Sequence, residues 1–351
     1  MERLVRSCYK QGGYVFAKKA GGRTHGAGDH RVARLASNEN PEGPSPAAVK
    51  AAQEAVLSAN RYPDERVDVL VAALKAHYGD YTFVAGVGMD GVIETLMRTL
   101  VDPGDTVVIS TPTFSFYGLA AQAQGAKVVS VPRRADFSVD TDALIAAGKD
   151  AKIVVLCTPN NPTGNATSAD DVTKVLEGIH GILFLDNAYV EFSGIDYLPL
   201  LRKYENLVIG RTFSKVYSLA GLRIGYAFVP AWLQPYYTRA GTPFTVNSVS
   251  AAAAAAALTD RAHVARYIAQ VAAWRKRFAT EVKYPVLPSD ANFVMVDVAP
   301  HTSDEVVEKL ATKGVLARSC RSFTGLADHY IRVSVGEDWE NELFIRELNA
   351  L

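Results

Sequence analysis

The chain has 351 residues, with 37 lysines plus arginines against 37 aspartates plus glutamates. A chain of this length can bury a large core, and usual domain sizes predict two domains or one large domain with a smaller companion. The zero net charge gives no overall field that would favour nucleic acid or an anionic membrane, so any anion site must be local.

The cysteine and hydropathy patterns exclude further classes of protein. Cys8, Cys157 and Cys320 are odd in number and far apart, which fits neither a disulfide framework nor a CxxC motif, so we expect reduced cysteines and no metal site. The longest apolar run, the alanine-rich segment 251–258, is too short to span a bilayer, and the first residues lack the apolar core of a signal peptide. We therefore expect a soluble cytoplasmic protein without membrane partners.

The first third of the chain predicts an arm followed by two helices. Residues 1–45 are rich in glycine, basic residues and turn formers, which is typical of an arm that crosses a surface. Ser45 can cap a helix that begins with Pro46 and carries an apolar face. A second helix is predicted from the apolar spacing over 67–74 and should end near Gly79.

Between residues 84 and 230, short apolar runs alternate with helical patterns. The runs are rich in valine and isoleucine without polar alternation, which indicates strands of a mostly parallel sheet covered by helices on both faces. Because ligands bind at the carboxyl ends of such strands, the site residues should follow directly after the runs. These runs lie at 106–110, 126–131, 152–157, 182–186 and 206–212.

The last third predicts a smaller α/β domain. A long helical region at 248–281 is followed by shorter strands and helices. The expected organisation is an arm at 1–45 that joins the small domain, a large domain at 46–245 and a small C-terminal domain at 246–351.

Polar residues follow two of the predicted strands. Asp186 ends the run "ILFLD", where an ionised carboxylate is costly unless it has a strong partner, and Tyr189 lies three residues on. Asn161 lies in the turn "TPNNPTGN", where the following proline restricts its backbone. Each of these residues, taken singly, is more often a turn or core residue than a ligand.

A glycine-rich turn lies before the run at 106–110, and an aromatic segment follows that run. Gly86, Gly88 and Gly91 form a GxGxxG that leads into a helix, whose free N–H groups suit a phosphate. A dinucleotide would need an acidic residue at the end of the next strand, which instead ends in Ser110, so a single phosphate fits better. Phe114 follows at the mouth of the sheet, where a planar ring could stack on it.

Taken together, these residues match the needs of one ligand. A planar heteroaromatic aldehyde with a phosphate needs a lysine for a Schiff base, an acid at its ring nitrogen, hydrogen bonds to its phenolic oxygen, a stacking face and a phosphate cup. In this chain Lys215 could form the Schiff base, Asp186 could meet the ring nitrogen, and Tyr189 and Asn161 could bond the phenolic oxygen. Phe114 offers the stacking face, and the 86–91 turn with Thr212, Ser214 and Arg223 offers the phosphate cup.

The chain resembles the fold-type I pyridoxal-phosphate aminotransferases over nearly its whole length. The resemblance implies an α/β fold with a large cofactor-binding domain and a smaller domain, pyridoxal 5'-phosphate as the cofactor, and a homodimer with shared active sites. The stretches that carry it are "ASNENPEGPSP" 36–46, "RYPD" 61–64, "GVGMDG" 86–91, "VDPGD" 101–105, "PTFSFY" 112–117, "PNNPTG" 159–164, "DNAYVEF" 186–192, "RTFSKVYSLAGLRIGY" 211–226, "PFTVNS" 243–248, "ANF" 291–293 and "YIRVSVG" 330–336.

The resemblance also implies a role for each matching residue. Lys215 would hold the cofactor covalently and transfer the proton as general acid and base, and Asp186 would keep the ring nitrogen protonated. Asn161 and Tyr189 would bond the phenolic oxygen, and Phe114 would stack on the ring. The phosphate would be held by Gly88, Met89, Asp90, Thr212, Ser214, Arg223 and Tyr62 of a neighbouring subunit.

Within this family, the stretches are most similar to enzymes that exchange an amino group between histidinol phosphate and 2-oxoglutarate, giving imidazole acetol phosphate and glutamate, in histidine biosynthesis. Arg332 and either Arg318 or the nearby Arg321 would bind the substrate anions, because a guanidinium can take a phosphate or a carboxylate. Asn38 and Glu42 are also expected at the substrate. Glu42 departs from the family's aromatic or aliphatic residue, and its carboxylate would either disfavour a phosphorylated substrate or contact an imidazole.

Several alternatives remain open from the sequence. An aromatic or broad-range aminotransferase, or an enzyme similar to phosphothreonine decarboxylase, would keep the cofactor and change the substrate or reaction. A dinucleotide-binding oxidoreductase rests only on the GxGxxG. A non-catalytic binding protein of this fold would be expected to lose the Schiff-base lysine, which is present as Lys215.

Overall fold

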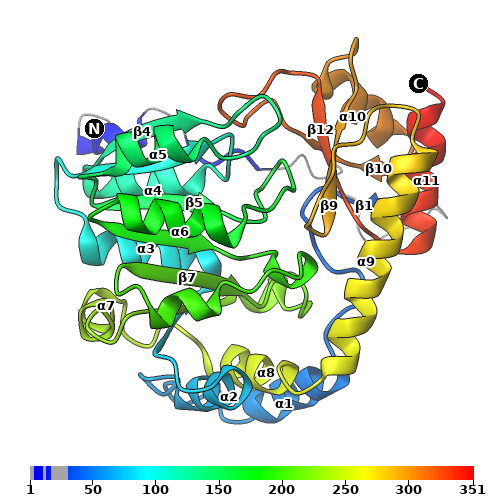
Figure 1. The fold of residues 1–351 in the computed structure, drawn as a ribbon. Coiled ribbons are helices and arrows are strands. Elements are labelled where there is room, and N and C mark those ends of the chain that lie inside the picture. Colours follow the sequence, from blue (N-terminus) through cyan, green and yellow to red (C-terminus); the bar gives the residue numbers. More distant parts are fainter. Residues whose placement is uncertain (1–3, 11–12, 17–30) are drawn as a thin grey trace.

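A seven-stranded sheet of order β2-β8-β7-β6-β5-β3-β4 lies at the centre of the larger part of the molecule (Figure 1). This computed structural model describes residues 4–10, 13–16 and 31–351. Neighbouring strands are parallel except at β8, which runs antiparallel to both β2 and β7. The strands are β2 (Phe83–Val87), β3 (Thr106–Thr111), β4 (Lys127–Pro132), β5 (Ile153–Cys157), β6 (Ile182–Asp186), β7 (Leu207–Thr212) and β8 (Ile224–Phe228).

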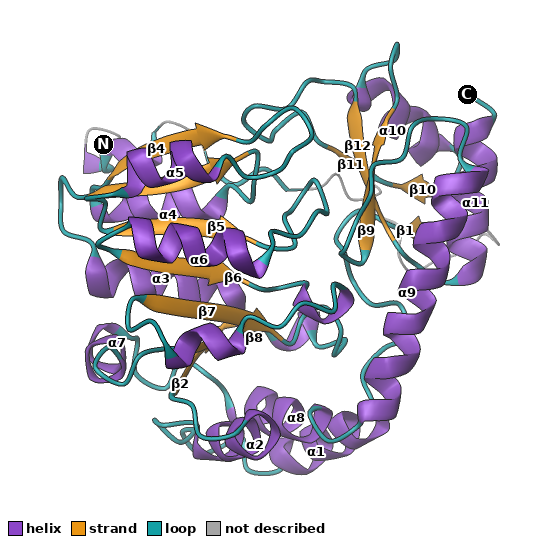
Figure 2. Cartoon of the chain, viewed as in Figure 1, coloured by secondary structure: helices purple, strands orange, loops and turns teal. Residues whose placement is uncertain are grey.

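Helices cover both faces of this sheet, α3 and α4 on one and α5 and α6 on the other (Figure 2). Every residue of β5, β6 and β7 is buried, which agrees with the apolar runs and with the predicted α/β fold class. The run at 126–131 forms the edge strand β4, most of which is exposed or partly exposed, so its predicted burial on both faces is wrong. The helices of this part are α3 (Gly88–Leu100), α4 (Phe116–Gln124), α5 (Thr141–Gly148), α6 (Ala169–Gly178), α7 (Gln234–Ala240), and the short η3 (Val190–Phe192), η4 (Leu198–Arg202) and η5 (Ala220–Leu222).

A smaller sheet lies beyond the carboxyl ends of the central strands (Figure 1). It is antiparallel, with the order β11-β12-β9, and the helices α9, α10 and α11 lie beside it. In the N-terminal segment, β1 pairs in parallel with β10, so residues 33–34 lie with this smaller part. Its elements are β1 (Ala33–Arg34), α9 (Arg261–Glu281), β9 (Phe293–Asp297), α10 (Ser303–Thr312), β10 (Val315–Leu316), β11 (Arg318–Ser319), β12 (Tyr330–Ser334) and α11 (Asp338–Asn349), and η2 (Ser7–Tyr9) precedes them in the chain.

Three helices pack together at the lower end of the view in Figure 1, namely α1 (Pro46–Val56), α2 (Asp68–Tyr78) and α8 (Ser248–Ala257). The long helical region expected at 248–281 is divided into α8 and α9, because the side chain of Asp260 accepts a hydrogen bond from the N–H of His263 and caps α9. α9 then leads from this group to the smaller sheet. This packing favours a domain boundary after α8 rather than at residue 245, and the division into domains remains our proposal.

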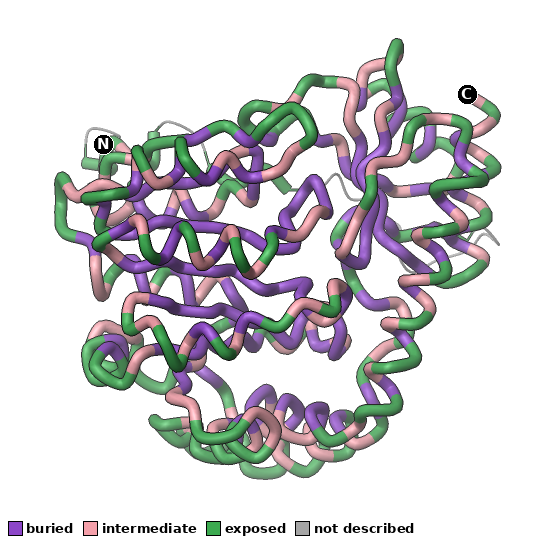
Figure 3. The backbone as a smooth tube through the Cα atoms, viewed as in Figure 1, coloured by how far each residue is buried: buried purple, intermediate pink, exposed green. Residues whose placement is uncertain are grey.

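Burial is concentrated in the central sheet and in the strands of the smaller sheet that face it (Figure 3). The outer surfaces of the covering helices are exposed. Among the helices of the described residues, none is both long enough and apolar enough to cross a membrane.

Candidate active site

Asp186 is the last residue of β6 and lies at the carboxyl end of the central sheet. Its side chain is buried and accepts hydrogen bonds from the Tyr117 hydroxyl (2.6 Å) and the Ala188 N–H (2.9 Å). Burial raises the pKa of Asp186 to about 6, although these two hydrogen bonds oppose the shift. The carboxylate is therefore ionised at neutral pH in a desolvated place, where a cationic group such as a protonated ring nitrogen would be bound strongly.

Lys215 lies in the loop after β7 and points toward the same region. Its Nζ donates a hydrogen bond to the Ser37 carbonyl at 3.2 Å and lies 5.6 Å from the ring centre of Tyr189. Burial, with a further contribution from the cation of Arg332, lowers the pKa of Lys215 to about 8. A substantial fraction of this amine is neutral near physiological pH, as attack on an aldehyde requires.

The residues expected around a phosphate meet at the start of α3. Gly88 has a φ of +68°, and its N–H donates to the Arg223 carbonyl at 3.0 Å. The positive φ favours glycine here, and a Cβ at this position would also lie 2.6 Å from Nη2 of Arg223 and displace its guanidinium. Arg223 also pairs with Asp90 at 2.8 Å, and the Ser214 N–H donates to Oγ1 of Thr212 at 3.1 Å.

This arrangement fits a bound phosphate. The 13-residue helix α3 has no side-chain cap on its first N–H groups, because Val87 stands at the capping position. A phosphate would accept hydrogen bonds from the N–H groups that follow Gly88, whose own N–H is taken by the Arg223 carbonyl, and from the Arg223 guanidinium. The phosphate would thereby take the place of the missing side-chain cap.

Three further residues expected at the cofactor lie where the sequence predicts them, at strand ends or next to them. The ring of Phe114 packs edge-on against Tyr117, 5.5 Å between centres, and keeps part of its surface exposed. The Tyr189 hydroxyl accepts a hydrogen bond from the Asn38 amide at 3.1 Å. Oδ1 of Asn161 accepts from Nη1 of Arg332, which links the large sheet to the small one.

Arg318 and Arg332 are opposite each other on β11 and β12, so both arginines enter the site from the smaller sheet. Nη2 of Arg332 donates to the Ala36 carbonyl at 2.7 Å. Nη2 of Arg318 donates to the Val15 carbonyl at 2.7 Å and to the Ser322 hydroxyl at 3.1 Å. These bonds are to neutral acceptors, and a substrate anion could replace them.

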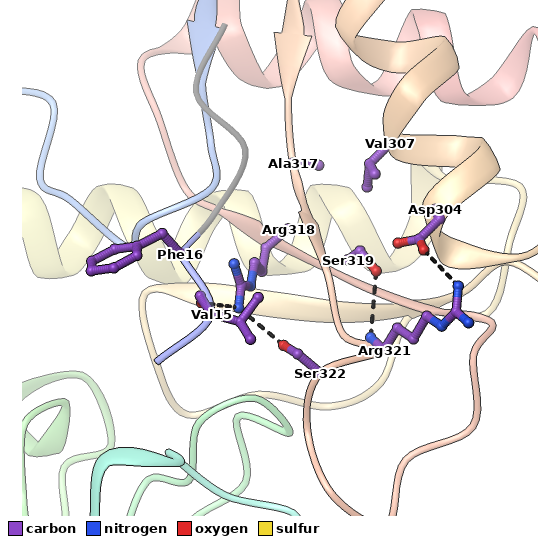
Figure 4. Close-up of a pocket in the computed structure, with 9 residues that line it drawn as sticks. All are labelled: Val15, Phe16, Asp304, Val307, Ala317, Arg318, Ser319, Arg321 and Ser322. Carbon is purple, nitrogen blue, oxygen red and sulfur yellow. Dashed lines mark hydrogen bonds and ion pairs between the residues drawn. The ribbon is translucent and has the colours of Figure 1, made fainter. Parts of the chain in front are cut away.

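Arg321 points away from Arg318 in the cavity that both residues line (Figure 4). Its guanidinium pairs with Asp304 at 3.0 Å and is largely exposed. Of the two arginines considered from the sequence, Arg321 therefore already has a carboxylate partner, whereas the bonds of the Arg318 guanidinium are to neutral acceptors.

Two expected site residues lie elsewhere in the single chain. The carboxylate of Glu42 pairs with Arg266 of α9 at 3.0 Å and lies 3.9 Å from Nδ1 of His263, so its partner in this structure is α9, and the expected contact with substrate stays a prediction. Tyr62 is 83% exposed and stacks on Phe244, with 4.8 Å between ring centres, away from the cofactor residues of its own chain.

Sequence reasoning missed Tyr117, which donates to Asp186. The segment "PTFSFY" offered three aromatic residues, of which only Phe114 was assigned a role. The available signal was the hydroxyl itself, because a tyrosine buried at a strand end must find a hydrogen-bond partner.

Comparison with known proteins agrees with this geometry. The sequence pattern of the family "Aminotransferase class I and II" matches residues 30–348, and the chain belongs to that family. It is 62% identical to the histidinol-phosphate aminotransferase of Methanoculleus marisnigri and 57% identical to that of Methanosphaerula palustris, each over 100% of both chains. It also resembles the crystal structure of histidinol-phosphate aminotransferase from Sinorhizobium meliloti in complex with pyridoxal-5'-phosphate, at 29% identity and a TM-score of 0.83 over 91% of this chain and 90% of that one. The predicted family and fold class are thereby confirmed.

Proposed function

We propose that this chain is a pyridoxal-phosphate-dependent aminotransferase that exchanges the amino group of histidinol phosphate with 2-oxoglutarate. The observation that carries the proposal is the convergence of the Lys215 amine, the buried Asp186 carboxylate and the Arg332 guanidinium. Besides burial, the Lys215 cation acts on the pKa of Asp186, and the Arg332 cation acts on the pKa of Lys215. The names of the similar proteins support the choice of substrate.

Pyridoxal phosphate, when bound, supplies an aldehyde for covalent attachment and a ring that withdraws electrons from the substrate. Lys215 would hold the aldehyde carbon. Once released from that bond by the substrate, its Nζ would move a proton from the amino-bearing carbon of the substrate to the former aldehyde carbon, and in the opposite direction in the second half of the reaction. Asp186 would keep the ring nitrogen protonated, and Asn161 and Tyr189 would hold the phenolic oxygen. Phe114 would stack on the ring, and Gly88, Met89, Asp90, Thr212, Ser214 and Arg223 would hold the phosphate.

The substrate assignment is tested by mixing the loaded protein with each amino donor separately. Histidinol phosphate is expected to remove the visible absorption of the bound cofactor within one turnover, and 2-oxoglutarate should restore it. Aromatic amino acids and phosphothreonine serve as the alternatives, the latter with a measurement of released carbon dioxide. A response to one of these and none to histidinol phosphate would refute the proposed substrate.

The two arginines of the small sheet would bind the substrate anions, and Asn38 would hold Tyr189 beside them. Arg318→Ala is expected to raise KM for both substrates by at least about 30-fold, because the substrate anion loses its charged partner. This value is at the lower end of the effects found when one partner of a buried charge pair is removed. Arg321→Ala should change KM less than about twofold, because its ion pair with Asp304 is exposed and weak. Steady-state kinetics decide between them, and a larger effect at Arg321 would reverse the assignment.

We also propose that the active protein is a homodimer in which Tyr62 reaches the phosphate of the neighbouring subunit. Val56 at the end of α1 is 54% exposed, and Leu57 and Tyr62 in the connection that follows are 86% and 83% exposed, so these apolar side chains are available for burial against a second copy. The cytoplasm is the proposed location, which the three free cysteines support.

Leu57→Asp is expected to yield monomers with weaker cofactor binding, because a charge on this face opposes burial against a second copy. Sedimentation measures the mass against that of one 37.9 kDa chain, and fluorescence measures the cofactor affinity. Val129→Asp, on the partly exposed edge strand β4, is the control and should stay dimeric. Full cofactor affinity in monomeric Leu57→Asp would contradict the role of Tyr62.

A further inference from the structure

The segment at residues 37–42 connects the loop of Lys215 to α9. At one end, the Ser37 carbonyl accepts a hydrogen bond from Nζ of Lys215 at 3.2 Å. Three residues on, Nδ2 of Asn40 donates to the Val216 carbonyl at 3.1 Å, and this carbonyl belongs to the residue directly after Lys215. Asn40 is 8% exposed and Val216 is fully buried, so the bond is shielded from water.

The orientation of the Asn40 amide is set by Glu42. The N–H of Glu42 donates to Oδ1 of Asn40 at 3.0 Å, so the amide nitrogen must face Val216. The carboxylate of Glu42 then accepts a hydrogen bond from Nε of Arg266 at 3.1 Å and forms an ion pair with Nη2 of the same side chain at 3.0 Å. The bonds form a continuous series from the backbone beside Lys215 to a side chain of α9.

We propose that Asn40 and Glu42 are positioning residues for Lys215. Asn40 fixes the backbone beside Lys215, and the Glu42–Arg266 pair holds Asn40 to α9. The inference rests on the proposed role of Lys215 as the residue that holds the cofactor. It gives Glu42 a function other than the substrate contact expected from the sequence.

Proton transfer by Lys215 requires that its Nζ be placed accurately. Small displacements of a catalytic group reduce the rate strongly, whereas substrate affinity is set by other contacts. A residue that positions Lys215 should therefore affect kcat more than KM. A residue that binds substrate should do the opposite, because its loss removes binding energy.

The first test is Asn40→Asp in the full-length protein loaded with pyridoxal phosphate. The change is isosteric, but the donor to the Val216 carbonyl is lost. We expect kcat to fall about 10- to 100-fold with KM within about twofold. The pH midpoint of the cofactor's visible absorption should move upward, because the nitrogen of Lys215 becomes more accessible to water.

Asn349→Asp is the matched control. Asn349 makes the same two kinds of bond far from the site, donating to the Glu281 carbonyl at 2.7 Å and accepting from the Lys283 N–H at 2.8 Å. This variant should keep the wild-type kcat and pH midpoint. Equal kinetics and equal midpoints in Asn40→Asp and Asn349→Asp would overturn the inference.

The second test is a double-mutant cycle at Glu42 and Arg266. Glu42→Ala and Arg266→Ala should each lower kcat and raise the pH midpoint by similar amounts, and the double variant should be no worse than either. Arg277→Ala breaks another exposed ion pair of α9, with Glu281 at 2.6 Å, and should change neither value. A rise of KM for histidinol phosphate alone in Glu42→Ala would return Glu42 to the substrate site and overturn the inference.

The cycle also decides the question if Asn40→Asp does not fold. A different result would refute the proposed function itself: a wild-type protein that shows no visible absorption dependent on Lys215. A wild-type protein with that absorption, together with unaffected Glu42 and Arg266 variants, would refute only the positioning role.

Discussion

Lys215→Ala is expected to abolish amino transfer. Loss of general acid–base catalysis alone lowers kcat by about 10²- to 10⁴-fold, and the loss of covalent attachment adds to this. The amine suits both tasks because burial lowers its pKa to about 8, so that neutral and charged forms are both populated at neutral pH. Single-turnover measurements with histidinol phosphate and the visible spectrum of the bound cofactor report the two losses separately.

Two variants show whether the effect belongs to this amine. Lys215→Arg keeps the positive charge but has a pKa too high for a neutral nucleophile, so it should be as inactive as Lys215→Ala. Lys203→Ala, at an exposed position before β7, should retain full activity. Substantial activity in Lys215→Arg would mean that the charge, and not the nucleophile, is what the site needs.

The central strands could be predicted from the sequence because their burial on both faces leaves a continuous apolar run. β5, β6 and β7 are buried at every position, and the runs at 152–157, 182–186 and 206–212 match them closely. β2 and β8 were not among the predicted runs. β8 contains Gly225, Tyr226 and Ala227 and so lacks a run of valine and isoleucine, and it overlaps the stretch 211–226 that carries the family resemblance.

The site residues could be predicted where a strand end or a family stretch fixes their place. Asp186 ends a buried strand, and Asn161 and Lys215 follow two others, so the local sequence indicates their place at the edge of the sheet. Glu42 could not be placed in this way, because its partner Arg266 is 224 positions further along the chain. A charged residue near a site gives no local sign of whether it meets substrate or a distant helix.

Asp186→Asn is the second change with a large expected effect, and it should act in opposite directions on catalysis and on stability. A neutral amide cannot hold the positive ring nitrogen, so kcat should fall about 10²- to 10³-fold, as for the loss of one preorganised electrostatic partner. Tyr117→Phe removes only the hydrogen bond to Asp186 and should lower kcat much less. Equal kcat in wild type and Asp186→Asn would refute the role of the carboxylate.

Without cofactor, the same carboxylate is expected to destabilise the fold. Its pKa rises from 3.8 to about 6 in the folded state, so its contribution to stability is fully present below pH 3.8 and is lost as the pH rises through about 6. Above that pH the ionised group lowers the free energy of unfolding by about 3 kcal/mol relative to an unshifted one. Asp186→Asn should therefore be more stable than wild type at pH 8 and show a much smaller difference at pH 4.5.

Urea denaturation of the cofactor-free proteins at the two pH values measures this difference. Tyr117→Phe is again the control, because loss of its hydrogen bond should lower stability and raise the pKa of Asp186 further. Addition of pyridoxal phosphate should make wild type more stable to urea than Asp186→Asn, since only the carboxylate gains a cationic partner. A cofactor-free Asp186→Asn that is less stable than wild type at pH 8 would show that the carboxylate is already compensated within the folded chain, and that it is not held ready for a cation.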